Sequence, residues 1–183
     1  SILDLTKTAM GGRLLKKWVS RPLKVKDQIQ KRLDAVEDLL QNRNERKKLS
    51  ESLNSIADLE RLLSKIATGK AVPRDVIQLK ISLVKISEIK NQLVKFSSGA
   101  IKSISDALIL LPDLIKEIQK VLNENYVSGI DNYGIINKGY DAELDELKDI
   151  LINGKTWMEN FQSRERNRTG ISSLKIDFNK VFG

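Results

Sequence analysis

Two glycine-containing segments come closest in this sequence to a nucleotide-binding motif. A phosphate-binding loop needs glycines that let the backbone approach the phosphates, followed at a fixed spacing by Lys and then Ser or Thr. Gly134 and Gly139 have the four-residue gap, but Tyr140 and Asp141 follow them. Residues 154–156, Gly-Lys-Thr, have the ending without the leading glycine, inside a predicted helix. Since neither segment has both halves of the motif, the sequence predicts no nucleotide site.

Acidic residues at helical spacing are the second chemical candidate. Asp141, Asp145 and Asp149 lie at every fourth position, on one face of a predicted helix. A divalent cation needs oxygen ligands that converge from several directions, whereas one helix face supplies only a row. The sequence therefore favours carboxylates that face solvent and interact with the positive end of the helix dipole. We predict no metal ligand and no catalytic residue.

The composition removes most other catalytic chemistry. The 183 residues include no His and no Cys, which excludes thiolate nucleophiles, disulfides, zinc fingers and Ser-His-Asp triads. An enzyme based on Lys or carboxylate side chains stays an alternative. It would need a concave pocket with convergent polar groups, and the sequence indicates none. We therefore expect no catalysis by this chain alone.

Basic residues outnumber acidic ones, 32 to 24, and concentrate in three stretches. These are residues 7–24 (Lys7, Arg13, Lys16, Lys17, Arg21, Lys24), 43–48 (Arg43, Arg46, Lys47, Lys48) and 164–168 (Arg164, Arg166, Arg168). Contact with phosphate groups is the functional interpretation. Acidic residues are interleaved, however, and composition alone favours solvated helix faces. Aromatic residues make up only 5% of the chain, which disfavours stacking on single-stranded bases.

Three features bear on where the protein works. No stretch reaches the roughly 20 apolar residues that a membrane span needs. The first residues, Ser-Ile-Leu-Asp, form no basic and then apolar leader. The absence of Cys fits a reducing compartment. We expect a cytoplasmic protein, associated with the nucleoid if it is bacterial, with no membrane partner.

Apolar residues recur at steps of three and four, which predicts an all-α fold. Predicted helices cover residues 10–20, 25–42, 57–68, 73–95 and 101–111, with another from Pro112 and a weaker one at 46–53. In the second helix one face carries the apolar residues, with Leu39 beside them, as the core-facing side of an amphipathic helix does (Ile29, Leu33, Val36, Leu40). Gly69 is expected to cap the end of the third helix, and Pro73 and Pro112 to open later ones.

The longest predicted helix follows a segment rich in Asn and Gly at 123–139, which we interpret as an internal boundary. Asp141 is its expected N-cap, and an extension to Arg168 would span about 42 Å. Its apolar residues alternate spacings of three and four, which predicts a seam for a partner helix (Leu144, Leu147, Leu151, Gly154, Met158, Phe161). A helix this long crosses or projects from a compact domain of this size. We expect this helix to be least stable, and to bend most easily, at Gly154.

The C-terminal residues have the alternation of a β-strand. Leu174, Ile176 and Phe178 alternate with Lys175 and Asp177. A single strand leaves its backbone groups unpaired and is not stable alone. The helical seam before it also lacks a partner. We therefore expect this chain to be a piece of a longer protein.

Several blocks of residues resemble the MutS family of mismatch-repair proteins. They are residues 6–18 (TKTAMGGRLLKKW), 21–23 (RPL), 32–40 (RLDAVEDLL), 58–75 (from DLERLLSKIA to PRD), 139–147 (GYDAELDEL), 164–170 (RERNRTG) and 174–183 (LKIDFNKVFG). The blocks occur in the family's order over nearly the whole chain, and only residues 85–138 are weakly diagnostic. The resemblance implies the multihelical core and lever domain, with a long projecting helix and a short β segment at its C-terminal end. Its parts would be a helical core (1–125), a connector and lever helix (126–170) and the truncated start of the clamp domain (171–183).

The resemblance also implies a function for those parts. MutS proteins are dimers that encircle DNA, recognise a mispair with an N-terminal domain and hydrolyse ATP in a C-terminal one. The family's Phe-x-Glu motif and nucleotide-binding loop have no counterpart in these residues. The resemblance therefore implies no cofactor in this fragment, and ATP and Mg²⁺ for the full-length protein. The fragment would couple the ATPase mechanically to the DNA clamp, through a lever seam at Leu144, Leu147, Leu151, Met158 and Phe161.

The implied partners follow from the same comparison. They are the double-stranded DNA backbone, held by the clamp, a second copy of the full-length protein, and a MutL-type protein. Lys175 and Lys180, near the clamp, are our candidates for phosphate contact. One alternative from another class is a coiled-coil scaffold or adaptor without enzymatic activity. It explains the helices and the seam but not the terminal strand.

Overall fold

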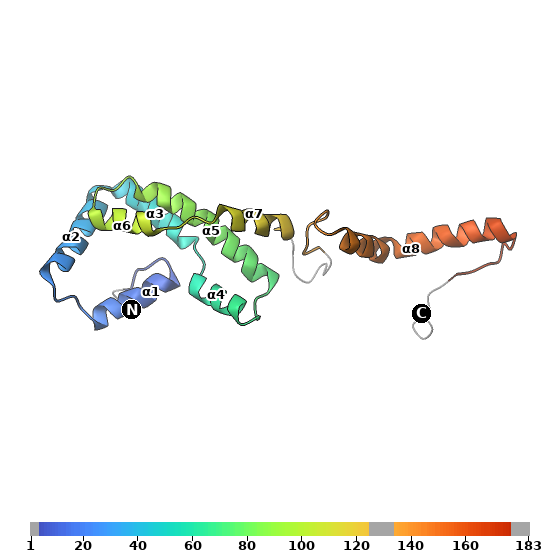
Figure 1. The fold of residues 1–183 in the computed structure, drawn as a ribbon, viewed down its shortest axis with the longest axis horizontal. Coiled ribbons are helices and arrows are strands. Elements are labelled where there is room, and N and C mark those ends of the chain that lie inside the picture. The colour runs from blue at the N-terminus through green and yellow to red at the C-terminus, as the bar shows by residue number, and fades with distance from the viewer. Residues whose placement is uncertain (1–3, 125–133, 177–183) are drawn as a thin grey trace. The chain divides into compact units, whose positions relative to one another are not determined.

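The structure is a computed structural model that describes residues 4–124 and 134–176. Those residues form eight α-helices and no β-strand, which confirms the all-α prediction. The helices are α1 (Ala9–Ser20), α2 (Lys26–Gln41), α3 (Arg43–Asn54), α4 (Leu59–Ala67), α5 (Pro73–Leu93), α6 (Gly99–Ala107), α7 (Pro112–Val121) and α8 (Ala142–Thr169). The chain divides into two compact units, Ser1–Glu124 with α1 to α7 and Asn125–Gly183 with α8 (Figure 1).

Caps and prolines determine several helix ends. The Thr8 hydroxyl accepts the Gly11 N–H at 3.0 Å and caps the start of α1. Pro73 and Pro112 lie in the first turns of α5 and α7, where the missing N–H costs nothing. Gly69, just after α4, has a φ of 67°, the left-handed conformation that ends helices.

Two predicted boundaries are wrong. The weak helix expected at 46–53 extends over Arg43–Asn54, because Asn42 both ends α2 and precedes the first turn of α3. The helix expected at 101–111 ends at Ala107. Residues 108–111 are irregular because Lys90 takes the Leu108 carbonyl in a 2.6 Å hydrogen bond, and because the residue before Pro112 is pushed out of the helical region.

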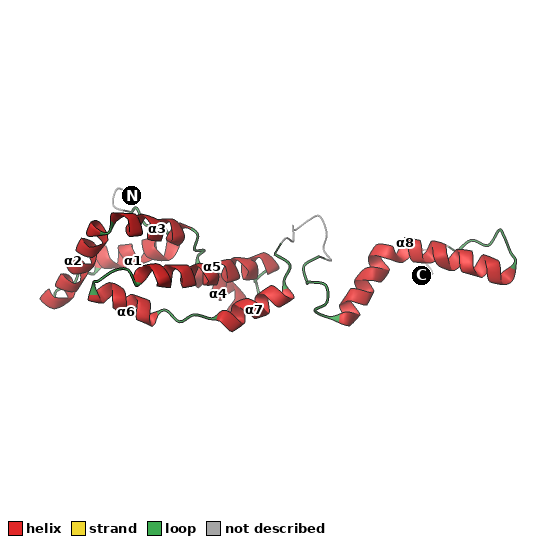
Figure 2. Ribbon diagram, turned by 90° about the horizontal axis from the view of Figure 1, so that it is seen from above, coloured by secondary structure: helices red, strands yellow, loops and turns green. Residues whose placement is uncertain are grey.

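The core of the first unit forms where α5 ends. Phe96 is 1% exposed and packs with three other buried residues, Ile89, Leu93 and Ile101. Helices α3, α4, α6 and α7 all contact α5, and α2 contacts α3 and α6. Figure 2 shows α5 running between α3 and α6. The central position of α5 makes it the element on which the rest of this unit is assembled.

A buried carboxylate joins α2 to the start of α6. Asp38 is 6% exposed, and its Oδ2 accepts the N–H groups of Ser97 and Ser98, both at 2.7 Å. Its Oδ1 accepts from Asn42 Nδ2 at 2.8 Å. Ser98 precedes α6 and makes no capping hydrogen bond with its own side chain. Asp38 therefore satisfies the backbone donors at the entry to α6 from a different helix.

The predicted core-facing stripe of α2 is wrong. Its four apolar residues are between 39% and 62% exposed (Ile29, Leu33, Val36, Leu40). Leu39, beside that stripe, and Ala35 pack against the core instead. Both residues lie next to Asp38 on the helix surface, so the face that carries the buried carboxylate is part of the face that turns inward. Exposed aliphatic side chains cost the fold less than a buried carboxylate without hydrogen-bond partners would. The hydrogen bonds of Asp38 therefore decide which face of α2 turns inward.

Two more polar side chains of α5 are buried and paired. Ser82 is 0% exposed; its hydroxyl donates to the Gln78 carbonyl at 2.9 Å and accepts the Ala57 N–H at 3.1 Å. The buried Lys80 ammonium pairs with the Glu124 carboxylate. Burying a charge is unfavourable unless it is paired. The Lys80–Glu124 ion pair therefore fixes the chain to the middle of α5 at the residue where the first unit ends.

Candidate functional site

The long helix α8 has a defined beginning and end. Asp141 Oδ1 accepts the Leu144 N–H at 2.9 Å, which confirms Asp141 as the N-cap. Acidic residues occupy the first turn and Arg166 and Arg168 the last, as the helix dipole favours. Gly170 ends the helix with a φ of 73° and donates its N–H to the Arg166 carbonyl. Local sequence thus specifies both ends of a helix of 28 residues.

The five predicted seam residues share one side of α8 by their helical spacing. Leu147 and Leu151 are 52% and 60% exposed, whereas Leu144, Met158 and Phe161 are partly buried. None of the described side chains of α8 is buried. The apolar surface of this helix therefore lies open in the structure, and the role of these residues as a seam stays a prediction.

Aromatic stacking stabilises the second half of the seam. The rings of Trp157 and Phe161 are parallel within 3°, with centroids 5.2 Å apart. The Arg164 guanidinium lies 5.5 Å from the Phe161 ring centroid, within cation–π range. These residues are one or two turns apart, so the contacts hold side chains along the helix and do not bind it to another element.

Figure 2 shows α8 bent along its length. Gly154 is the only glycine between Ala142 and Thr169. A Cβ placed on it would meet no atom within 4 Å, so close packing does not require glycine here. An interior glycine lowers local helix stability, and kinks in helices concentrate at such positions. Gly154 is therefore the residue at which we expect α8 to bend most easily.

The acidic row at the start of α8 is divided among separate partners. Asp141 caps the helix, while Asp145 Oδ2 accepts the Gly139 N–H at 2.6 Å. Asp149 Oδ1 lies 4.0 Å from Lys138 Nζ. Within residues 4–124 and 134–176, no three acidic side chains are grouped so that they could hold a metal ion. The row therefore anchors the preceding loop to the helix.

The chain folds back onto α8 after its last turn. Arg166 Nε donates to the Leu174 carbonyl at 2.7 Å, and the Ile176 N–H donates to Gln162 Oε1 at 2.8 Å. These side chains take backbone groups that a neighbouring strand would otherwise pair. Residues 174–176 accordingly form no strand, and the rest of the predicted β segment lies outside the described residues. Of the two lysines predicted to contact phosphate, Lys175 is described and exposed, whereas Lys180 lies outside the described residues.

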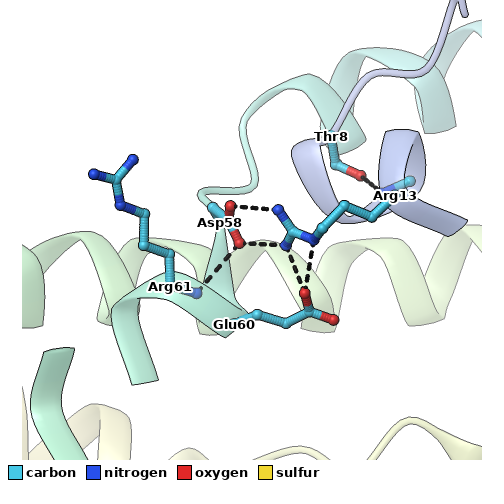
Figure 3. Close-up of polar contacts among 6 residues, drawn as sticks. Thr8, Arg13, Asp58, Glu60 and Arg61 are labelled. Atoms are coloured by element: carbon cyan, nitrogen blue, oxygen red, sulfur yellow. Dashed lines mark hydrogen bonds and ion pairs between the residues drawn. The ribbon is translucent and has the colours of Figure 1, made fainter. Parts of the chain in front are cut away.

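A polar cluster in the first unit joins α1 to the start of α4 (Figure 3). The Arg13 guanidinium donates from Nη1 and Nη2 to the two Asp58 carboxylate oxygens, at 2.9 and 2.7 Å, and from Nε to Glu60 Oε2 at 2.9 Å. Asp58 also caps α4, since its Oδ1 accepts the Arg61 N–H at 3.3 Å. The hydrogen bond from Arg13 lowers the pKa of Asp58 below its ordinary value, and the two carboxylates, Asp58 first, raise the pKa of Arg13.

Sequence analysis missed the partners of Arg13 and the role of Asp38. Composition alone places Arg13 among solvated basic residues, and two glycines precede it in the sequence, Gly11 and Gly12. A Cβ on Gly11 would lie 2.9 Å from Thr8 Oγ1, and one on Gly12 would lie 3.3 Å from Asp4 Oδ2. The glycines make room for polar side chains of the preceding turn. No local pattern signals the role of Asp38, because its backbone partners lie 59 and 60 residues further along the chain.

None of the described helices has the length and apolar character of a segment that crosses a bilayer.

Comparison with known proteins gives a family. The model of MutS domain III matches residues 1–173. Over 182 residues the chain is 46% identical to a DNA mismatch repair protein MutS of Caldanaerobacter subterraneus subsp. tengcongensis, covering 100% of this chain and 21% of that protein.

Two other relatives give the same result. The DNA mismatch repair protein MutS of Salinibacter ruber is 44% identical over 183 residues, and that of Halothermothrix orenii is 42% identical over 183 residues; this chain covers 20% of each. The chain thus spans about a fifth of the length of these relatives, and the matches do not favour a coiled-coil scaffold. The agreement along the whole chain confirms the resemblance seen in the sequence, and the chain belongs to the MutS domain III family.

Proposed function

We propose that this chain couples an ATPase domain to a DNA clamp within a MutS-type mismatch-repair protein. The observation that carries the proposal is α8, an uninterrupted helix of 28 residues with both ends capped and no described side chain buried. At 1.5 Å per residue its contour spans about 42 Å. Such a helix can transmit a displacement between distant parts of a protein. The open seam of α8 would pack against a returning helix of the same protein.

The proposed division of labour follows the resemblance. Residues 1–125 form the core, residues 126–170 the connector and a projecting lever helix, and residues 171–183 begin the clamp. The terminal segment becomes a strand once a neighbouring strand pairs with it, because an isolated strand is not stable. A mismatch-recognition domain precedes this chain, and an ATPase domain that binds ATP and Mg²⁺ follows it. In this scheme the catalytic groups belong to the ATPase domain.

In this scheme the partners act on the full-length protein. The clamp grips the backbone of double-stranded DNA, two copies form a dimer, and a MutL-type protein binds the assembly. Mismatch repair by this protein would take place in the cytoplasm, at the nucleoid if the protein is bacterial. The net charge of +8 suits a protein that stays close to DNA.

A chimaera tests the proposal directly. This chain replaces the matched segment of the Caldanaerobacter relative, which is 46% identical to it. We expect the chimaera to bind a mismatched duplex and to release it when ATP is added, as followed by fluorescence anisotropy. A chimaera that folds and binds the duplex, yet keeps it after ATP addition, would contradict the coupling function.

Gly154→Ala in that chimaera is expected to stiffen α8 and to change the rate of ATP-induced release from mismatched duplex. Alanine fits, since no atom lies within 4 Å of the added Cβ, and it favours a helix interior by about 1 kcal/mol over glycine. Stopped-flow anisotropy measures the release rate. Asn160→Ala is the matched control, because it raises helix propensity at an exposed position of α8 without removing the glycine. Equal release rates for Gly154→Ala and the unmodified chimaera would count against a flexing lever.

Lys175→Gln in the chimaera is expected to reduce the salt dependence of duplex binding. If the exposed Lys175 neutralises one phosphate, the slope of log K against log [salt] decreases by about 0.9. Titrations at several salt concentrations measure it, and Lys180→Gln should behave alike. Lys116→Gln on α7 removes the same charge from the first unit as a control. A slope that Lys175→Gln and Lys180→Gln leave unaltered excludes both contacts.

A further inference from the structure

Helix α1 is held to the first unit by only part of its apolar side chains. None of its residues is buried. Met10 and Leu15 are partly buried, and Met10 lines an apolar pocket together with Leu53 and Leu93. The other large apolar side chains are 48%, 42% and 62% exposed (Leu14, Trp18, Val19), and since apolar stabilisation scales with the area removed from water, they contribute little to docking α1. Contacts of another kind are therefore needed to fix the orientation of α1.

Two arginine contacts supply them. Arg13 makes three hydrogen bonds to Asp58 and Glu60, all between 2.7 and 2.9 Å, and thereby reaches the first turn of α4. At the other end of α1, the Arg32 guanidinium of α2 lies 3.6 Å from the centroid of the Trp18 ring. Paired N–H donors on one carboxylate fix direction as well as distance, whereas a guanidinium stacked on a ring can slide and rotate parallel to the plane of the ring. Arg13 is thus the contact that sets the angle of α1.

The surroundings of Arg13 fit this role. Gly11 and Gly12 leave room for the Thr8 hydroxyl and the Asp4 carboxylate, so that the N-terminal turn closes tightly beside Arg13. Asp58 is held in place because it also caps α4. Arg61, three residues after Asp58, points its guanidinium away from the cluster in Figure 3, and the group with which it bonds to Asp58 is its backbone N–H. Arg13 thus bonds to Asp58 through its guanidinium, whereas Arg61 bonds to Asp58 through its backbone N–H.

We propose that Arg13 is a positioning residue for coupling: it fixes α1 on α4, so that a displacement arriving through α1 moves the first unit as a body. The inference rests on the proposed function, in which the mismatch-recognition domain precedes this chain. Without the Arg13 contacts α1 would turn on its remaining attachment, and part of the displacement would be lost before it reached α5.

Hydrogen exchange on this 183-residue chain tests the structural half. In Arg13→Met, amides of α1 are expected to exchange about tenfold faster, while those of α5 keep their protection. Arg13→Lys keeps the charge but loses the paired geometry, and should give an intermediate rate. Arg61→Met removes a neighbouring charge and should leave α1 unchanged. The inference is wrong if α1 exchanges at its original rate in Arg13→Met, or if Arg61→Met accelerates it equally.

The chimaera tests the functional half. Arg13→Met is expected to slow ATP-induced release several-fold while mismatch affinity without ATP stays constant, and Asp58→Asn, which keeps the α4 cap, should act in the same direction. Normal release in Arg13→Met with a loosened α1 would overturn the positioning role but leave the proposed function intact. Failure of the unmodified chimaera to release duplex would instead contradict the proposed function.

Discussion

Phe96→Ala is expected to lower the free energy of unfolding of the first unit by about 3–5 kcal/mol. The ring is 1% exposed and packs against Ile89, Leu93 and Ile101, so its removal loses apolar burial and leaves a cavity. Residues from α2 and α3 pack on the same cluster and cannot all move to fill the space. A loss of this size approaches the whole stability of many domains.

Urea unfolding of this chain, followed by circular dichroism, measures the effect. Leu40→Ala is the matched control, since it truncates a large apolar side chain that is 62% exposed, and it should cost less than about 1 kcal/mol. If Phe96→Ala and Leu40→Ala unfold at similar urea concentrations, the core is not centred at the end of α5.

The second large effect is expected for Asp38→Ala, at about 3 kcal/mol of unfolding free energy. The substitution leaves the N–H group of the buried Ser98 and the partly buried N–H group of Ser97 without their acceptor, and removes the acceptor of Asn42. Unsatisfied buried donors lose their full hydration energy, and hydrogen bonds to a charged acceptor are stronger than neutral ones.

Two variants separate this role from a general effect of charge. Asp38→Asn keeps an oxygen acceptor and is expected to cost less than Asp38→Ala. Asp34→Ala removes a carboxylate one turn earlier on the exposed side of α2 and should change stability by less than about 0.5 kcal/mol. Equal unfolding midpoints for Asp38→Ala and Asp34→Ala would mean that α6 does not depend on α2 for its entry.

The helices were predictable where local sequence determines them. Apolar spacing with Pro73, Gly69 and Asp141 at the ends is enough to locate α4, α5 and α8 to within a few residues. The inward face of α2 was not predictable by counting apolar residues, because Asp38 buries itself against a segment 59 residues further along the chain. Such a partner is invisible to any local pattern.

In the candidate site, too, local features were predictable from the sequence and contacts between distant residues were not. The caps of α8 are local and follow from the sequence, whereas the packing of its seam depends on residues that this chain does not contain in the proposed scheme. The Arg13 cluster joins residues 45 and 47 positions apart, and no periodicity relates them. The coupling function follows from the resemblance to the MutS family, whereas Arg13 and its partners, with which it can be tested, follow from contacts in the structure.

The ion pair between Lys80 and Glu124 has a mechanical consequence. Tension applied to the chain beyond residue 124 would load the middle of α5, the longest helix of the first unit, before it could peel α7 from its end. A pull along the backbone would thus act first on this ion pair, and the force that separates Lys80 from Glu124 would mark the first step in the yielding of the first unit.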